Sequence, residues 1–377
     1  MDYGTLKIIW WFLIVVLFVG FFILGGRDFG VCILLPWVAR NDNERRLFIN
    51  SIGPTWGGNQ VWFVTAGAAI FAAWPLVYAT AFSGLYYALF IVLLSLILRP
   101  PGFDFRSKLA SPIWRTLWDF ALFISGFVPA LIFGVALGNL LLGFPFYLDG
   151  TMQSHYEGTF WQLLNPFSVV FGLATIFILS FHGGVYLQKK LAEEFLQRLK
   201  RINLFTGGVF ALLFFLLGAW ILFGINGYHI DSPIDVNAAL LPGTKTVTIG
   251  PNLWLFNFEH FRQLWLFPIF TLAALMLGIL FSSMNFSTLA VLMSSLTIVF
   301  ALGTVGAAVF PFIMPSSSHP NDSLTLWDAT SSHLSLQYMF FVVAIFLPIV
   351  LCYTFWVYRV LTGKVETKEV LRDPESY

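Results

Sequence analysis

Side chains that could do chemistry are few in this chain, and the most unusual of them form a charged pair. The stretch GGRDFGVCILLPWVA, residues 25–39, contains Arg27 and Asp28 but is otherwise almost wholly apolar. Of the six histidines, His182 in SFHGGVYLQ is the one that lies within a long apolar run. A single histidine can ligate a haem iron, but a lone histidine near the end of an apolar helix more often hydrogen-bonds to backbone or water. Haem ligation by His182 is therefore the less favoured of two open interpretations.

The sequence lacks the other familiar patterns of catalytic and metal-binding residues. Cys32 and Cys352 lie in or beside apolar stretches, without CxxC spacing or a companion histidine cluster, which is typical of inert packing residues. No stretch resembles a nucleophile–base pair, a phosphate loop or a zinc site. The formal net charge is +1, so there is no electrostatic case for a nucleic-acid partner.

The composition decides which kind of scaffold must position these residues. Hydrophobic residues make up 58% of the 377 residues and charged residues only 10%, against about 25% charged in a typical soluble domain. So few charges cannot cover a surface that faces water. The first apolar segment is longer than a signal peptide, so we expect it to remain as a membrane helix. The sequence predicts an all-α polytopic membrane protein that forms a single transmembrane domain over residues 1–377.

Nine apolar runs are long enough to cross a bilayer, which takes about 20 residues. The predicted spans are residues 6–26, 61–80, 82–98, 117–142, 161–187, 203–224, 264–281, 288–314 and 336–358. The segments 143–160 and 225–263 are predicted to be ordered external loops. Nine spans place the two termini on opposite sides of the membrane.

Basic residues are distributed unequally between the two sets of loops. One set holds Arg40, Arg45, Arg46, Arg99, Arg106, Lys108, Arg115, Lys189, Lys190, Arg198, Lys200, Arg201, Arg359, Lys364, Lys368 and Arg372. The other set holds Lys7, Lys245 and Arg262. Because cytoplasmic loops are enriched in Lys and Arg, we predict a periplasmic N-terminus and a cytoplasmic C-terminal tail, KVETKEVLRDPESY.

Three stretches of the chain carry a family resemblance. They are NDNERRLFINSIGPTWGGNQVWFVTAGAAIFAAWPLVYATAFSG (41–84), RPPGFDFRSK (99–108) and PFIMPSSSHPNDSLTLWDATSSHLSLQ (311–337). Together with IWWFL near the start, GNLLLGFPF at 138–146 and FWQLLNPF at 160–167, they resemble subunit II of the cytochrome bd ubiquinol oxidases. The resemblance extends over nearly the whole chain.

The resemblance implies a fold of two four-helix bundles plus one further helix, and a role without catalytic centres. In that family the haems b and d and the site of quinol oxidation belong to subunit I, which pairs with subunit II as a heterodimer in the bacterial inner membrane. A small single-helix accessory subunit is a further expected partner. We therefore expect no haem ligand in this chain, although a quinone or lipid could bind to it.

Reduction of O2 to water in such a complex takes protons from the cytoplasm, and buried proton transfer needs acids, polar groups and water. The candidates for a route are Asp28, Asp104 and Asp119, with Asn59 and Gln60 as neutral hydrogen-bonding groups. Two alternatives stay open: Asp119 could favour the N-terminal end of its helix through the helix dipole, and Asp104 could be a solvated loop residue.

Family motifs also include residues with a predicted packing or interface role: Trp62, Trp327 and Asp328. The chain departs from the family at Gly25 and Gly57, where an acidic residue is usual. Two carboxylates near the expected route are therefore missing. Protons then travel through water and the remaining acids of this chain, or they enter through subunit I.

A secondary transporter or a membrane scaffold protein is the alternative function. A transporter would be expected to have charged or broken helices near the middle of the bilayer. Apart from Arg27 and Asp28, we find no charged residue deep in a predicted span, so transport is disfavoured. Arg27 lies about 31 Å along the first helix, which places the pair near the cytoplasmic boundary. We expect Arg27 to extend toward the headgroups and Asp28 to face the bundle interior.

Overall fold

The first helix, α1 (Tyr3–Val38), is longer than the bilayer is thick. Its 36 residues rise about 54 Å, whereas the hydrocarbon core is about 30 Å. Asp2 caps the helix, since its side chain accepts a hydrogen bond from the Thr5 backbone amide at 3.0 Å. The predicted span 6–26 is therefore too short: residues 29–38 continue the helix, and Pro36 lies inside it. This computed structural model describes residues 1–365.

Helices make up most of the described chain. The other α-helices are α2 (Asp42–Ile52), α3 (Trp56–Ala73), α4 (Pro75–Gly84), α5 (Tyr86–Leu96), α6 (Arg99–Phe105), α7 (Pro112–Leu142), α8 (Phe160–Leu163), α9 (Pro166–Lys190), α10 (Leu196–Gly224), α11 (Phe256–His260), α12 (Leu266–Ser283), α13 (Ser287–Val309) and α14 (His333–Val360). Short 3₁₀ helices are η1 (Glu193–Phe195), η2 (Leu253–Leu255), η3 (Arg262–Trp265) and η4 (Pro320–Asp322).

Within residues 1–365, eight helical segments are long and apolar enough to cross a membrane. They correspond to the predicted spans with one exception, which confirms a multi-pass membrane architecture. The exception is the predicted span 61–80, which is divided between α3 and α4. The division falls at Trp74, because Pro75 lacks a backbone N–H and occupies the first turn of a new helix.

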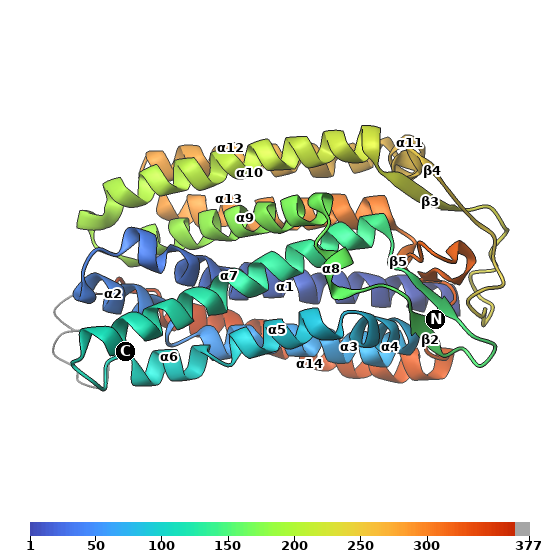
Figure 1. Ribbon diagram of the computed structural model, residues 1–377, viewed down its shortest axis with the longest axis horizontal. Helices are drawn as coiled ribbons and strands as arrows, with labels where there is room; N and C mark the ends of the chain where they lie inside the picture. The colour runs from blue at the N-terminus through green and yellow to red at the C-terminus, as the bar shows by residue number, and fades with distance from the viewer. Residues whose placement is uncertain (366–377) are drawn as a thin grey trace.

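Successive long helices run back and forth between two ends of the molecule (Figure 1). We call the end that carries α2 and α6 the basic end, and the end that carries the β-strands the hairpin end. The α14 helix begins beside the N-terminus, where His333 Nε2 lies 3.0 Å from the Met1 carbonyl oxygen. It ends at Val360, at the basic end. Met1 and Val360 thus lie at opposite ends of the molecule.

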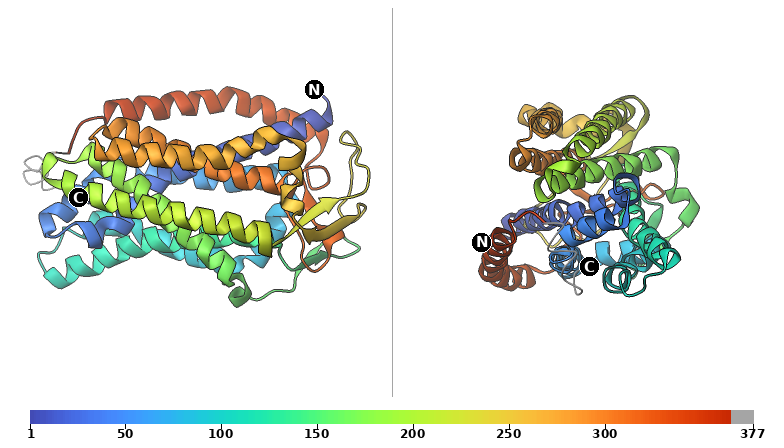
Figure 2. Two further views of the ribbon diagram at one scale, coloured as in Figure 1. Left: turned by 90° about the horizontal axis from the view of Figure 1, so that it is seen from above. Right: turned by 90° about the vertical axis from the view of Figure 1, so that its left-hand side faces the viewer.

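Two views show how the helices are grouped (Figure 2). The helices α9, α10, α12 and α13 pack together, and α1 and α7 contact this group mainly through α9. The α14 helix lies at the edge, and Leu336 is its one buried residue within the described chain.

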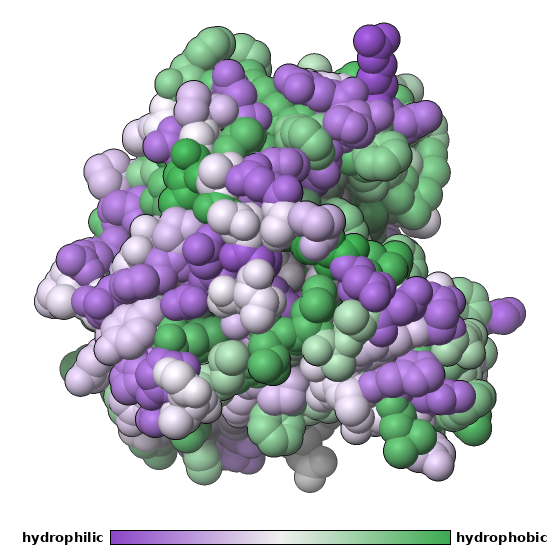
Figure 3. Space-filling view, turned by 90° about the vertical axis from the view of Figure 1, so that its right-hand side faces the viewer, coloured by the Kyte–Doolittle hydropathy of each residue, from purple (hydrophilic) through white to green (hydrophobic). Residues whose placement is uncertain are grey.

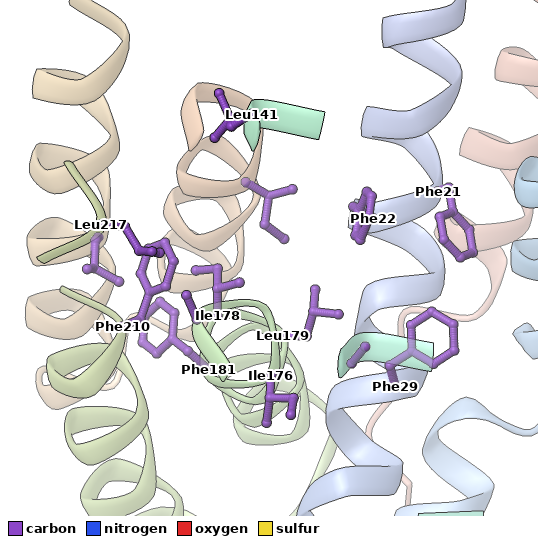
Figure 4. Close-up of a cluster of buried hydrophobic side chains, with 14 of the residues drawn as sticks. Phe21, Phe22, Phe29, Leu141, Ile176, Ile178, Leu179, Phe181, Phe210 and Leu217 are labelled. Atoms are coloured by element: carbon purple, nitrogen blue, oxygen red, sulfur yellow. The ribbon is translucent and has the colours of Figure 1, made fainter. Parts of the chain in front are cut away.

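The main core lies where α1, α9 and α10 meet (Figure 4). Its members include Phe21, Phe22, Phe29, Leu179, Phe181, Phe210 and Leu217. Because lipid is as apolar as these side chains, dispersion and close packing hold such helices together rather than exclusion from water. Close approach is visible at Gly30, where a Cβ would lie 2.9 Å from the Cα of Gly183.

Three two-stranded antiparallel sheets cover the hairpin end. They pair β1 (Phe146–Leu148) with β2 (Ser154–Tyr156), β3 (Asn226–Ile230) with β4 (Val247–Pro251), and β5 (Phe312–Met314) with β6 (Leu324–Thr325). Hydrophilic side chains gather over much of this face (Figure 3). The expectation of ordered loops at 143–160 and 225–263 is correct, but an all-α description omits these hairpins. The predicted span 288–314 also ends early, at Val309, and β5 follows.

Candidate functional site

A chain of hydrogen bonds connects three helices through Asp28, which is 1% exposed. Asn59 on α3 donates from Nδ2 to Asp28 Oδ2 at 3.0 Å. Tyr358 on α14 donates its hydroxyl to Asn59 Oδ1 at 2.6 Å. The other carboxylate oxygen, Oδ1, is buried and has no hydrogen-bond partner among the described residues. Asp28 therefore faces the protein interior, as its position beside Arg27 predicted, and keeps one oxygen available to a proton or a water molecule.

Arg99, at the start of α6, is 1% exposed and is close enough to this carboxylate for the two charges to interact. Its Nη2 donates to the Ser125 carbonyl at 2.9 Å, and its Nη1 donates to Gln60 Oε1 at 3.4 Å. The guanidinium carbon lies 4.7 Å from the centroid of the Phe29 ring. We call Asp28, Asn59, Gln60, Arg99 and Tyr358 the Asp28 cluster. Its one arginine offsets the charge of its one carboxylate.

A second group, the arginine network, lies at the basic end. Arg106 binds Asp119 with both Nε, at 2.5 Å from Oδ1, and Nη2, at 3.2 Å from Oδ2. Arg45 on α2 adds a 2.8 Å contact to the same carboxylate. Asp42, also on α2, joins Arg106 at 2.9 Å and Arg115 at 2.8 Å. The network thus connects α2, the segment after α6 and α7.

Three arginines share two carboxylates in this network, and their ion pairs serve structural stability. Burial opposes the charge on Arg106, but the Asp119 and Asp42 carboxylates outweigh burial and raise the pKa of its guanidinium above the usual value. The arginines therefore hold Asp119 as an ion-pair partner. The helix-dipole explanation for Asp119 is wrong, because α7 begins at Pro112 and Asp119 lies about two turns inside the helix.

Asp104 joins neither group. It lies on α6 and its side chain is exposed, so the expectation of a loop residue is corrected to a position on a short helix at the surface. The structure therefore brings Asp28, Asn59 and Gln60 together and places Asp119 and Asp104 elsewhere at the basic end.

Of the three motif residues with predicted packing roles, Trp62 lies apart from the adjacent pair Trp327 and Asp328. Trp62 is 7% exposed and covers α1, since a Cβ at Gly20 would lie 2.5 Å from its ring. At the hairpin end, the Trp327 carbonyl accepts a hydrogen bond from Lys7 Nζ at 2.7 Å. Asp328 forms a buried salt bridge with Lys245 at 2.6 Å. Two basic residues of the hairpin end, Lys7 and Lys245, thus make contacts within the protein.

His182 was the one candidate haem ligand within a predicted span. Its Nδ1 lies 2.7 Å from Ser294 Oγ and its Nε2 lies 2.9 Å from the Ile23 carbonyl oxygen. Both ring nitrogens therefore have protein partners that hold the ring between α1, α9 and α13. This arrangement does not fit an axial haem ligand, which needs a nitrogen free to face iron.

Two members of the Asp28 cluster are not evident from the sequence. The charge pattern indicates Arg99 only as a loop cation, although LSLILRPP places it directly after an apolar run. Tyr358 looks like an aromatic residue at the membrane boundary. An arginine that ends an apolar run before two prolines could have signalled a buried cation, but its contact with Gln60 depends on helix packing.

Comparison with known proteins gives the family of the chain. The sequence model described as cytochrome bd terminal oxidase subunit II matches residues 6–361. Cytochrome bd-I ubiquinol oxidase subunit 2 of Escherichia coli (strain K12) is 44% identical over 375 residues, which cover 100% of this chain and 99% of that protein. Cytochrome bd ubiquinol oxidase subunit 2 of Bacillus subtilis (strain 168) is 29% identical over 97% of this chain and 98% of the relative.

A solved structure agrees at the level of the fold. The bd oxidase of Geobacillus thermodenitrificans matches with a TM-score of 0.67 over 95% of this chain and 98% of the matched chain, at 14% sequence identity. The sequence matches extend over nearly the full length and include each stretch that carried the family resemblance. The chain belongs to the cytochrome bd terminal oxidase subunit II family and is a subunit of a quinol oxidase.

Proposed function

We propose that this chain is the haem-free accessory subunit of a bd-type quinol:O2 oxidoreductase and forms a heterodimer with subunit I. Haems b and d and the reaction of quinol belong to subunit I in this proposal. The observation that carries it is the match of the family sequence model over residues 6–361. The engagement of both His182 ring nitrogens by Ser294 and Ile23 supports it. A quinone or lipid and a small single-helix accessory subunit complete the expected partners.

The proposed topology is a single transmembrane domain with nine crossings in the bacterial inner membrane. In it, α3 and α4 together form one crossing that is interrupted at Trp74, and the helices are divided into two four-helix bundles plus one helix. The described basic loop residues favour a cytoplasmic basic end and a periplasmic hairpin end. Lys368 and Arg372 and most of the tail lie outside the described residues.

The exposed face of α3, together with α14, is the proposed contact surface for subunit I. A methyl group added at Gly57 or Gly58 would have no neighbouring atom within 4 Å, and the same holds for Gly67. Small residues on a membrane helix allow another helix to approach closely. The large exposed side chains of α14, such as Phe341 and Ile345, supply apolar area beside them.

The Asp28 cluster supports a second proposal, that this subunit supplies cytoplasmic protons to the partner. Asp28 is the buried acid of the route, and Asn59 and Gln60 are neutral groups that order hydrogen bonds or water around it. Asp104 lies at the exposed surface of the same end, where a proton would enter. Asp119, paired with Arg45 and Arg106, borders the entrance.

Proton uptake by the complex in sealed vesicles tests this role. We expect Asp28→Asn to lower both turnover and membrane charging, because the amide cannot carry a proton. Asp104→Asn is matched in charge and lies at the surface, so a smaller decrease is expected. Unaltered turnover and charging in both variants would show that this subunit carries no essential proton. A visible spectrum of the purified complex without b- and d-type haems would contradict the oxidase assignment itself.

Substitution of Gly57 gives the complementary test, because it is expected to increase turnover rather than to lower it. An aspartate there restores the acid that is usual in the family, and the open space around Gly57 accommodates it. We expect Gly57→Asp to speed turnover if the natural glycine impairs the route. Gly58→Asp is the control, because it adds the same charge in equally open space but about 100° away around the helix. Equal rates in the two variants would argue against a specific role for position 57.

A further inference from the structure

A groove of ≈ 400 Å³ lies at the basic end between α1, α9 and α14. It is open on one side, and Arg27, Lys189 and Lys190 line it. No acidic side chain of the described residues lines it. Three cations therefore face one cavity whose described wall holds no carboxylate to neutralise them.

The arginine in this groove lies beside two aromatic rings rather than in a salt bridge. The Arg27 guanidinium lies 4.9 Å from the ring centroid of Tyr358 and 5.4 Å from that of Tyr186. Within the described chain it forms no salt bridge, and its buried Nε has no hydrogen-bond partner. Asp28, its neighbour in sequence, accepts from Asn59 instead. The two tyrosine rings hold the guanidinium in place through cation–π contacts and leave its charge available.

The two lysines differ in how they are held. Lys190 donates from Nζ to the carbonyl oxygens of Leu361 and Gly363. Lys189 is half-buried and has no described salt bridge. A carbonyl oxygen does not neutralise an ammonium group, so each lysine can still attract an anion.

The groove changes from polar to apolar along the helices. Lys189 and Lys190 are the last two residues of α9, so the cations lie at the level where the helix ends. Gly20 and Leu351 line the same groove seven residues before Arg27 and Tyr358, which is about 10 Å along each helix. A molecule that fills the groove thus meets cations at the expected headgroup level and apolar side chains toward the middle of the bilayer.

We propose that this groove binds an anionic phospholipid, with its phosphate at Arg27 and Lys189 and an acyl chain along α1 and α14. Charge complementarity favours an anionic headgroup, and the apolar half favours a lipid over free phosphate. Basic pockets between membrane helices on the cytoplasmic side are suited to such headgroups. The proposal is independent of proton supply, because it concerns binding and not turnover.

Lipid retained by the purified two-subunit complex is the direct test. The complex is incubated in mild detergent with phosphatidylglycerol or zwitterionic phosphatidylethanolamine, and bound lipid is measured by native mass spectrometry. We expect binding of phosphatidylglycerol to weaken about fivefold in Lys189→Gln and roughly 30-fold in the Arg27→Gln/Lys189→Gln double variant. Lys189→Arg should retain it.

The matched control is Lys200→Gln/Arg201→Gln, which removes two charges at the same end from α10, outside the groove. Its retention of phosphatidylglycerol should equal that of the unaltered complex. Equal losses in the groove and control variants would overturn the proposal. So would displacement of the lipid by inorganic phosphate, or equal retention of the zwitterionic lipid. Binding that appears only after residues 366–377 are deleted would assign the groove to the tail instead.

Discussion

Asn59 donates its side-chain amide to the Asp28 carboxylate at 3.0 Å while it accepts the Tyr358 hydroxyl at 2.6 Å. One amide therefore satisfies an acid on α1 and a phenol on α14, from a position near the start of α3. An amide can do both because it carries a donor and an acceptor on one planar group. The geometry ties the C-terminal part of α14 to the rest of the protein, while Trp10 and Met1 contact the start of the helix.

Asn59→Ala should destabilise the complex more than Tyr358→Phe does. The alanine removes both bonds and leaves a buried carboxylate oxygen without its donor, which costs about 1–3 kcal/mol. The phenylalanine removes one bond and keeps the ring beside Arg27, so about 0.6 kcal/mol is expected, the average for an interhelical bond in a membrane. Midpoints of thermal unfolding of the two variants measure the difference. A larger shift for Tyr358→Phe would contradict this ranking.

The arginine network should be most sensitive at its buried member. Arg106→Met leaves the buried Asp119 with Arg45 alone, and breaking a buried pair costs about 3–5 kcal/mol. Arg115→Met removes a half-buried contact to Asp42 near the surface and should cost about 0–1 kcal/mol. Unfolding at low and high salt distinguishes the two, because only the Arg115 effect should shrink as salt rises. Equal effects would mean that Arg106 is not the centre of the network.

The contact between α1 and α9 depends on Gly30. A Cβ there would clash with the Leu179 carbonyl and lie 2.9 Å from the Gly183 Cα, so Gly30→Ala must push the helices apart. We expect a loss of about 1–3 kcal/mol, typical of overpacking. Gly208→Ala on α10 is the control, because nothing lies within 4 Å of its Cβ position. Equal thermal unfolding midpoints for the two variants would show that α1 and α9 can accommodate a methyl group at Gly30.

Glu44 predicts a dependence of stability on pH. Burial raises the pKa of its carboxyl, but hydrogen bonds from Arg198, at 2.6 Å, and the Arg40 amide outweigh burial and lower it overall. A lowered folded-state pKa gives stability that is present above the ordinary value of 4.5 and is lost as pH falls below it. Between about pH 6 and about pH 3, Glu44→Gln should show a flatter fall in unfolding midpoint than the unaltered complex. Parallel curves would contradict the assignment.

The secondary structure was largely predictable, because membrane helices need long apolar runs whatever they pack against. The runs predicted the spanning helices, and the loop cations predicted which end is basic. Boundaries were less certain: α1 continues to Val38, since its last turns pack against Phe48 and Phe195 rather than lipid. The helix break at Trp74 and the three β-hairpins depend on local backbone geometry, which a hydropathy pattern does not predict.

For the candidate residues, the sequence could determine the chemical type of each side chain but not which side chains contact one another. Asp28, Asn59 and Gln60 were identifiable as polar groups beside apolar runs, yet Asp119 and Asp104 had the same appearance. Packing of α1 against α3 decided that Asp28 meets Asn59. The approach of α2 and of the segment after α6 to α7 decided that Asp119 meets Arg45 and Arg106.

The amino-acid sequence by itself determined that this protein is a multi-pass membrane protein, because 10% charged residues cannot solvate a surface and the apolar runs match the bilayer. It also determined the family, through blocks of residues in order along the chain. Only the tertiary structure decided which polar side chains share a buried site. A hydrogen bond requires two atoms within about 3 Å of each other. Asp28 and Asn59 are 31 positions apart and Asn59 and Tyr358 are 299 apart, so these pairs reach that distance only after the helices pack.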